Sequence, residues 1–226
     1  MKNIILQHFD GKLRELDYLS LENIMAYGNR IEADHQLVEG KPFRSHLTGP
    51  CQKAYCIDQK WDNYDNVLML DIDVFVTKNL VQDIFKVPGN GIHGATQIKL
   101  KQKLVALGRI KFNNPYWAGS IYKFSREDRK LLRSVMPRED DWMNEFNKPY
   151  CFEDEGILAE LASNVNFPSE YLDFKWNQCS FLPEPEKSYM IHIRTKKPGH
   201  PNGSWENGGK RNKIENYYDL AMKGVI

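Results

Sequence analysis

Four consecutive apolar residues, 67–70, run directly into the segment Asp71-Ile72-Asp73. An unbroken apolar run predicts a strand that is buried on both faces, as at the centre of a parallel or mixed sheet. Side chains alternate along a strand, so we expect Asp71 and Asp73 to project to the same side. Ligands of open α/β sheets bind beyond the carboxyl ends of the strands. The sequence therefore predicts a functional site at this end of the strand.

Strand and helix patterns alternate before this point. A short apolar run at 4–6 predicts a first strand, and the segment 35–38, before Gly40 and Pro42, predicts a second. Apolar spacing over 16–31 predicts a helix between them that begins near Ser20. A proline opens a second expected helix over 50–61. The order strand, helix, strand, helix, strand is typical of α/β proteins. We therefore expect an α/β fold, with a central mixed, mostly parallel sheet flanked by helices.

The rest of the chain continues the pattern within one domain of 226 residues. Further strands are expected at 91–96, 119–124 and 189–193, and helices from a capping box at Ser125 to before Pro137 and over 153–162.

Composition excludes several classes of protein. Lys and Arg number 31 against 30 Asp and Glu, so no global field favours nucleic acid or an anionic membrane. No apolar stretch is long enough for a transmembrane segment, and the apolar run at the start is too short for a signal peptide. We therefore expect a soluble, cytoplasmic protein without a nucleic-acid partner.

The two aspartates indicate a metal. Neighbouring carboxylates repel each other unless a cation lies beside them, and an oxygen-rich pair suits Mg²⁺ or Mn²⁺. His192 follows an apolar strand and could complete a site of two carboxylates and one imidazole. The alternative interpretation is that the strand simply ends in solvated acids and that His192 has a structural role.

The segment 196–213 differs from the rest, with four Gly, two Pro and five basic residues against one acid. This composition predicts either a solvated loop or a flexible basic lid over an anionic ligand, with Lys197 as its main contact.

Two enzyme classes place an Asp-x-Asp motif after a buried strand. Phosphatases of the haloacid-dehalogenase type carry it close to the N-terminus and continue it with Thr or Val at the fifth position. Here about 70 residues precede the motif and Phe75 holds that position. The nucleotide-sugar glycosyltransferases of the GT-A fold carry the motif after an N-terminal nucleotide-binding half, which this sequence resembles more closely.

Further segments, in family order, resemble the same glycosyltransferases, including the retaining glycogenin-like and blood-group-type families and their small viral or bacterial members. The matching segments are Leu21-Glu22-Asn23, Pro50-Cys51-Gln52-Lys53-Ala54, Tyr116-Trp117-Ala118-Gly119-Ser120, Asp154-Glu155-Gly156-Ile157-Leu158 and 190–198. The resemblance implies a nucleotide-binding half over about 1–75 and an acceptor half over about 90–195.

The resemblance also implies roles for single residues. Asp71, Asp73 and His192 would bind Mn²⁺ or Mg²⁺ on the diphosphate of a nucleoside-diphosphate sugar, with a UDP-sugar as the expected donor. Lys53 and Lys197 would neutralise phosphate charge. The residues expected to line the base pocket are His8 and Phe9, and those expected near the reacting sugar are Asp154 and Glu155.

The expected activity is sugar transfer to a glycan or another hydroxyl acceptor, with retention of configuration. The alternatives are a metal-dependent phosphatase and a non-catalytic carbohydrate-binding protein. A helix-terminal carboxylate such as Glu155 also interacts favourably with the helix dipole, so a purely structural role for it stays open.

Overall fold

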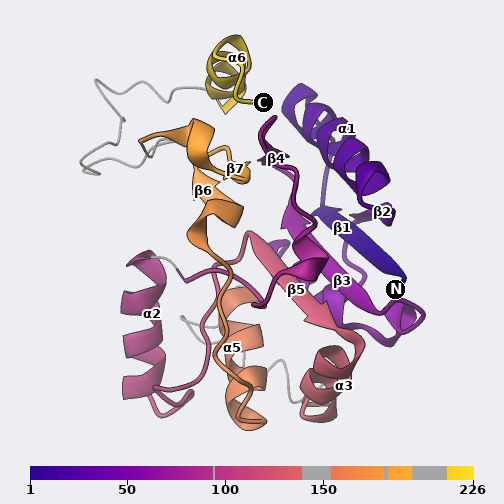
Figure 1. Ribbon diagram of the computed structural model, residues 1–226. Helices are drawn as coiled ribbons and strands as arrows, with labels where there is room; N and C mark the ends of the chain where they lie inside the picture. Colours follow the sequence, from indigo (N-terminus) through magenta and orange to yellow (C-terminus); the bar gives the residue numbers. More distant parts are fainter. Residues whose placement is uncertain (94, 139–153, 181–182, 195–212) are drawn as a thin grey trace.

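The computed structural model describes residues 1–93, 95–138, 154–180, 183–194 and 213–226 (Figure 1). Its strands are β1 (Asn3–Phe9), β2 (Ala33–Glu39), β3 (Asn66–Asp71), β4 (Val74–Val76), β5 (Ile121–Ser125), β6 (Gln178–Cys179) and β7 (Met190–His192). Its α-helices are α1 (Glu15–Arg30), α2 (Ala95–Ala106), α3 (Arg126–Ser134), α5 (Asp154–Asn164) and α6 (Lys213–Met222). Short 3₁₀ helices include η1 (Pro50–Ile57) and η2 (Gln59–Trp61), where the sequence predicted a single helix.

A four-stranded sheet in the order β2-β1-β3-β5 forms the centre of the molecule. β1 is parallel to both β2 and β3, and β5 pairs antiparallel with β3. This mixed, mostly parallel sheet flanked by helices confirms the predicted fold class. The division into a nucleotide half and an acceptor half stays a prediction.

The apolar run 67–70 is buried on both faces, as expected. Val67 and Met69 pack with Ile4 and Leu6 into one cluster, which includes residues of η1 and α5. Leu68 and its β1 partner Ile5 belong to a second cluster on the α1 side. Figure 1 shows α1 on one face of the sheet and α3 and α5 on the other.

A second sheet, which the sequence did not predict, has the order β4-β7-β6. β4 follows β3 after a two-residue turn, leaves the main sheet and pairs antiparallel with β7. Polar residues of α1 hold β4 in place. Ser20 Oγ donates to the carbonyl of Val74 at 2.7 Å, and Asn23 exchanges hydrogen bonds with the backbone of Val76.

These contacts correct the predicted start of the first helix. α1 begins at Glu15, and its capping box uses Arg14 and Asp17 rather than Ser20. Ser20 is fully buried inside the helix, where its hydroxyl serves β4. The predicted strand at 91–96 is also wrong: Gly91 makes an isolated bridge with Tyr122, and α2 begins at Ala95.

The remaining elements agree with the sequence more closely. Ser125 forms the capping box of α3, and β7 lies within its expected range. β5 and α5 overlap their expected ranges but end one and two residues beyond them, and residue 153 lies outside the described residues. Within the described part of the chain, no helix combines the length and apolarity needed to cross a membrane.

Candidate functional site

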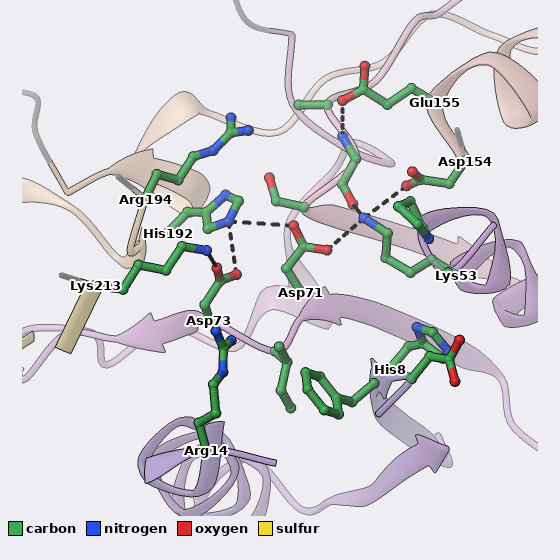
Figure 2. Close-up of a pocket in the computed structure, with 18 residues that line it drawn as sticks. His8, Arg14, Lys53, Asp71, Asp73, Asp154, Glu155, His192, Arg194 and Lys213 are labelled. Carbon is green, nitrogen blue, oxygen red and sulfur yellow. Dashed lines mark hydrogen bonds and ion pairs between the residues drawn. The ribbon is translucent and has the colours of Figure 1, made fainter. Parts of the chain in front are cut away.

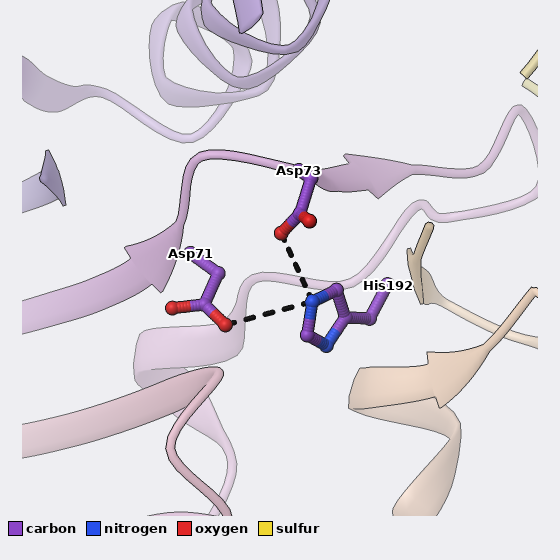
Figure 3. A group of neighbouring side chains, drawn as sticks. All are labelled: Asp71, Asp73 and His192. Carbon is purple, nitrogen blue, oxygen red and sulfur yellow. Dashed lines mark ion pairs between the residues drawn. The ribbon is translucent and has the colours of Figure 1, made fainter. Parts of the chain in front are cut away.

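The two aspartates of the motif lie in and beside the turn between β3 and β4 (Figure 3). β3 ends at Asp71, and Asp73 lies in the turn, so alternation along one strand does not bring them together as predicted. Instead the turn directs both carboxylates toward one imidazole. His192 Nε2 lies 2.9 Å from Asp73 Oδ1 and 3.5 Å from Asp71 Oδ2.

The second sheet places His192 at this turn. In the β4–β7 ladder His192 is the partner of Val74, the residue after Asp73. The amide of Ile193 donates to the carbonyl of Asp73 at 2.9 Å, which extends the contact by one residue. The imidazole therefore reaches the site through backbone pairing with the strand that follows the motif.

These three side chains form a group that could hold a metal ion. One ligand atom from each of Asp71, Asp73 and His192 lies within 4.8 Å of the other two. Two carboxylate oxygens and one imidazole nitrogen suit Mn²⁺ or Mg²⁺ better than a soft thiophilic ion. The donor set present in the chain therefore fits the expected divalent cation.

Basic groups already neutralise Asp73 in this structure. Burial alone would raise the pKa of Asp73. Electrostatic interactions and hydrogen bonds with His192 and Lys213 outweigh the effect of burial and hold that pKa well below its usual range. An ionised carboxylate is the form that coordinates a cation. Asp73 is therefore kept ready for a ligand role.

Lys53 of η1 joins Asp71 to a second carboxylate, Asp154 at the start of α5 (Figure 2). Its ammonium lies 2.6 Å from Asp71 Oδ1 and 3.1 Å from Asp154 Oδ2, and it also donates to the carbonyl of Gly119. Burial favours the neutral amine, but the charges of Asp154 and Asp71 raise the pKa of Lys53 above its usual value. Lys53 is therefore a buried cation beside the motif, and its expected contact with the donor phosphates stays a prediction.

Asp154 is almost completely buried. Burial raises its pKa to about 7, against the opposing charge of Lys53, and the hydroxyl of Tyr122 donates to Oδ2 at 2.5 Å. Lys53 and Tyr122 thus both contact one oxygen of this carboxylate. These contacts give Asp154 a positioning role in this structure, and its expected contact with substrate stays a prediction.

Glu155 follows at the edge of the same site. Its Oε1 accepts a hydrogen bond from the amide of Gly119 at 2.7 Å. A Cβ at Gly119 would lie 2.8 Å from Asp154 Oδ2 and 3.1 Å from Glu155 Oε1. Only glycine allows both carboxylates to approach the backbone so closely here, so the turn before β5 packs directly against the N-terminus of α5.

The carboxylates and the basic side chains described above line a cavity of about 400 Å³, a volume within the usual range for small-ligand sites. His8 and Phe9, at the end of β1, form another part of its lining. His8 Nε2 lies 2.7 Å from the carbonyl oxygen of Gly40, and burial lowers the pKa of the imidazole. A neutral imidazole next to an aromatic ring is compatible with a nucleoside, and the role of both residues as a base pocket stays a prediction.

Among the described residues, three cations besides Lys53 face this cavity, and Figure 2 shows them on the side of Asp73 and His192. They are Arg14, Arg194 and Lys213. Sequence reasoning did not single out Arg14, although its place just before α1 and beyond β1 was an available signal. It assigned Lys213 to a loop over 196–213, whereas Lys213 is the first residue of α6.

Other sequence-based expectations fall outside the site. Lys197, the predicted lid contact, lies outside the described residues, as does all of 196–212. Trp117, in the segment 116–120 that resembles glycosyltransferases, is fully buried and packs edge-on against Phe124 and Phe167. Its role is in the core.

No family model matches the chain, and no curated protein matches its sequence. Solved structures do match its fold. Galactosyltransferase LgtC, in complex with donor and acceptor sugar analogues, is similar with a TM-score of 0.59 and 13% identity, covering 97% of this chain and 95% of LgtC. An active-site mutant of LgtC matches with a TM-score of 0.55 and 12% identity, over 98% and 96% of the two chains.

A glycosyltransferase involved in glycosylation of the major capsid of PBCV-1 is also similar. Its TM-score is 0.50 at 15% identity, over 98% of this chain and 100% of that one. At such low identity these matches establish the fold alone. The chain therefore has the GT-A fold of nucleotide-sugar glycosyltransferases, in agreement with the expectation from its motifs.

Proposed function

We propose that this protein is a metal-dependent glycosyltransferase that uses a nucleoside-diphosphate sugar. The observation that carries the proposal is the convergence of Asp71, Asp73 and His192 in one cavity, on the GT-A fold, with four cations from the described part of the chain. A divalent cation bound by these three residues would neutralise the diphosphate as it leaves. The solved relatives are described as glycosyltransferases, which supports the same class of reaction.

Other residues of the cavity would have separate roles in binding the phosphates, the base and the sugar. Lys53 holds the carboxylate of Asp71 in place through an ion pair, and Arg14 and Arg194 offer positive charge to the phosphates from the opposite side of the motif. His8 and Phe9 would contact the base. Glu155, held by the Gly119 amide, would lie beside the sugar or the acceptor hydroxyl.

The finer assignments follow from the resemblance and from the chemistry of the cavity. A UDP-sugar is the expected donor and a glycan hydroxyl the expected acceptor, as LgtC binds donor and acceptor sugar analogues. The expected outcome is retention of configuration, with Mn²⁺ or Mg²⁺ as the cofactor.

The proposal is tested by incubating the protein with a panel of nucleotide sugars and Mn²⁺ and separating the products chromatographically. We expect slow release of nucleoside diphosphate from one donor, because transferases hydrolyse their donor slowly when no acceptor is present. Chelation of the metal should abolish this release. Release of inorganic phosphate from a phosphomonoester instead would identify a phosphatase. Sugar binding without any turnover of donor would identify a carbohydrate-binding protein.

Glu155→Gln separates a catalytic from a structural role for this carboxylate. The substitution keeps an acceptor for the Gly119 amide and removes only the charge. We expect turnover to fall about a hundredfold while the donor Kd changes little, as for a group that acts mainly in the transition state. Near-normal turnover with a stability loss of about 0.3–1 kcal/mol would assign Glu155 to the helix terminus instead.

A further inference from the structure

Lys213 reaches the metal group from a distant part of the chain. It begins α6 and donates to Asp73 Oδ2, while His192 contacts the other oxygen of the same carboxylate (Figure 2). α6 is fixed beside β7, because Asn216 donates to the carbonyl of Arg194 at 3.2 Å and Leu220 packs in a cluster with Ile191. The ammonium is therefore delivered by an anchored helix.

Two lysines together balance the charge of the motif. Lys53 contacts Oδ1 of Asp71, and Lys213 contacts Oδ2 of Asp73. A divalent cation entering alone would bring two further positive charges next to two ammonium groups. The Coulomb repulsion in this partly buried site opposes binding of the bare ion.

The two lysines differ in how firmly they are held. Among the described residues, Lys53 has contacts with two carboxylates and a carbonyl, and its side chain is 10% exposed. Lys213, within the described residues, contacts one carboxylate, that of Asp73, and its side chain is 32% exposed. Lys213 is therefore the cation that an incoming metal can displace.

We propose that Lys213 couples binding of the divalent cation to binding of the nucleoside diphosphate. The ammonium occupies Asp73 while the site holds no metal, leaves it when the cation binds, and then pairs with the negative charge of the diphosphate. This inference rests on the proposed function, since it assumes that cation and diphosphate share the cavity. Each ligand then raises the affinity of the other, because the diphosphate pairs with the Lys213 ammonium that the metal displaces from Asp73.

The test measures Mn²⁺ binding by calorimetry, with and without saturating UDP, and GDP in parallel. Lys213→Met is compared with wild type and with Lys223→Met, which removes an exposed lysine just after the same helix. Lys213→Met should bind Mn²⁺ alone about tenfold more tightly, and the enhancement of Mn²⁺ affinity by the nucleotide should shrink by a similar factor. Lys223→Met should match wild type, and Lys213→Gln provides a second replacement should the methionine variant fold poorly.

Two results would overturn the inference, and they can be told apart. If wild type binds both ligands and Lys213→Met shows the same Mn²⁺ affinity and the same coupling as Lys223→Met, Lys213 is a bystander and the proposed function stands. If wild type binds neither Mn²⁺ nor either nucleotide, the proposed function fails, and the coupling fails with it.

Discussion

Asp73→Asn is expected to lower kcat/KM for the donor by at least about a thousandfold, the equivalent of roughly 4 kcal/mol of transition-state stabilisation. The amide removes the negative charge that His192 and Lys213 now face, and an amide oxygen is a weaker ligand for Mn²⁺ than a carboxylate. The measurement is donor hydrolysis over a Mn²⁺ titration, together with direct Mn²⁺ binding. Both should show a large loss of metal affinity.

A surface acid provides the matched control for this variant. Asp34 lies on β2, where its carboxylate contacts Tyr64 and Lys2 at an exposed position. Asp34→Asn makes the same chemical change away from the cavity and should leave donor turnover unchanged. Wild-type activity of Asp73→Asn, or full activity of wild type in excess EDTA, would remove the metal from the mechanism.

The fold was predictable where local pattern and burial agree. The apolar run 67–70 implied a central strand, and β3 occupies that place between β1 and β5. Alternation of strands and helices implied the mixed sheet. These features depend on residues close together in the chain, and such patterns can be read from a single sequence.

The second sheet was not predictable, because it depends on a pairing between distant segments. β4 has three residues and pairs with β7 across more than a hundred positions, with no local signal for the partner. Ser20 misled the placement of α1 for the same reason. A buried serine resembles a helix cap in sequence, while its actual partner is the carbonyl of Val74.

The site divides in the same way. Asp71, Asp73 and His192 were identified from residue type and motif, although a turn rather than strand alternation brings the two acids together. Lys213 could not be identified as a contact of Asp73 from the sequence. Nothing near it marks an anchored helix that returns to the motif, since its position depends on packing of α6 against α1 and β7.

Lys53→Met is expected to destabilise the protein by about 3–5 kcal/mol, because it leaves the buried carboxylate of Asp154 and the half-buried carboxylate of Asp71 without their shared cation. Asp71 and Asp154 each lose an ion pair, and the carbonyl of Gly119 loses its donor. The change is measured by urea unfolding followed by circular dichroism. A loss below about 1 kcal/mol would show that the buried ion pairs contribute little.

A second buried lysine supplies the control. Lys123 and Lys53 are equally buried when the whole residue is considered. The ammonium of Lys123, however, donates to the carbonyls of Ile84 and Val87 and forms no carboxylate pair among the described residues. Lys123→Met therefore removes a buried ammonium without leaving a described carboxylate unpaired. We expect it to cost about 1–3 kcal/mol, less than Lys53→Met, since only neutral acceptors lose their donor.

The pH dependence separates the two variants further. Burial raises the pKa of Asp154 to about 7, above its usual value near 4, so the native state binds more protons than the unfolded state between these limits. The stability contribution of Asp154 therefore falls as pH rises from 4 to 7. Lys53 opposes this shift, so its removal raises the pKa of Asp154 further and extends the fall above pH 7. Lys53→Met should accordingly lower the free energy of unfolding by more at pH 8 than at pH 5. An equal penalty at both values would mean that Asp154 does not depend on Lys53 for its charge.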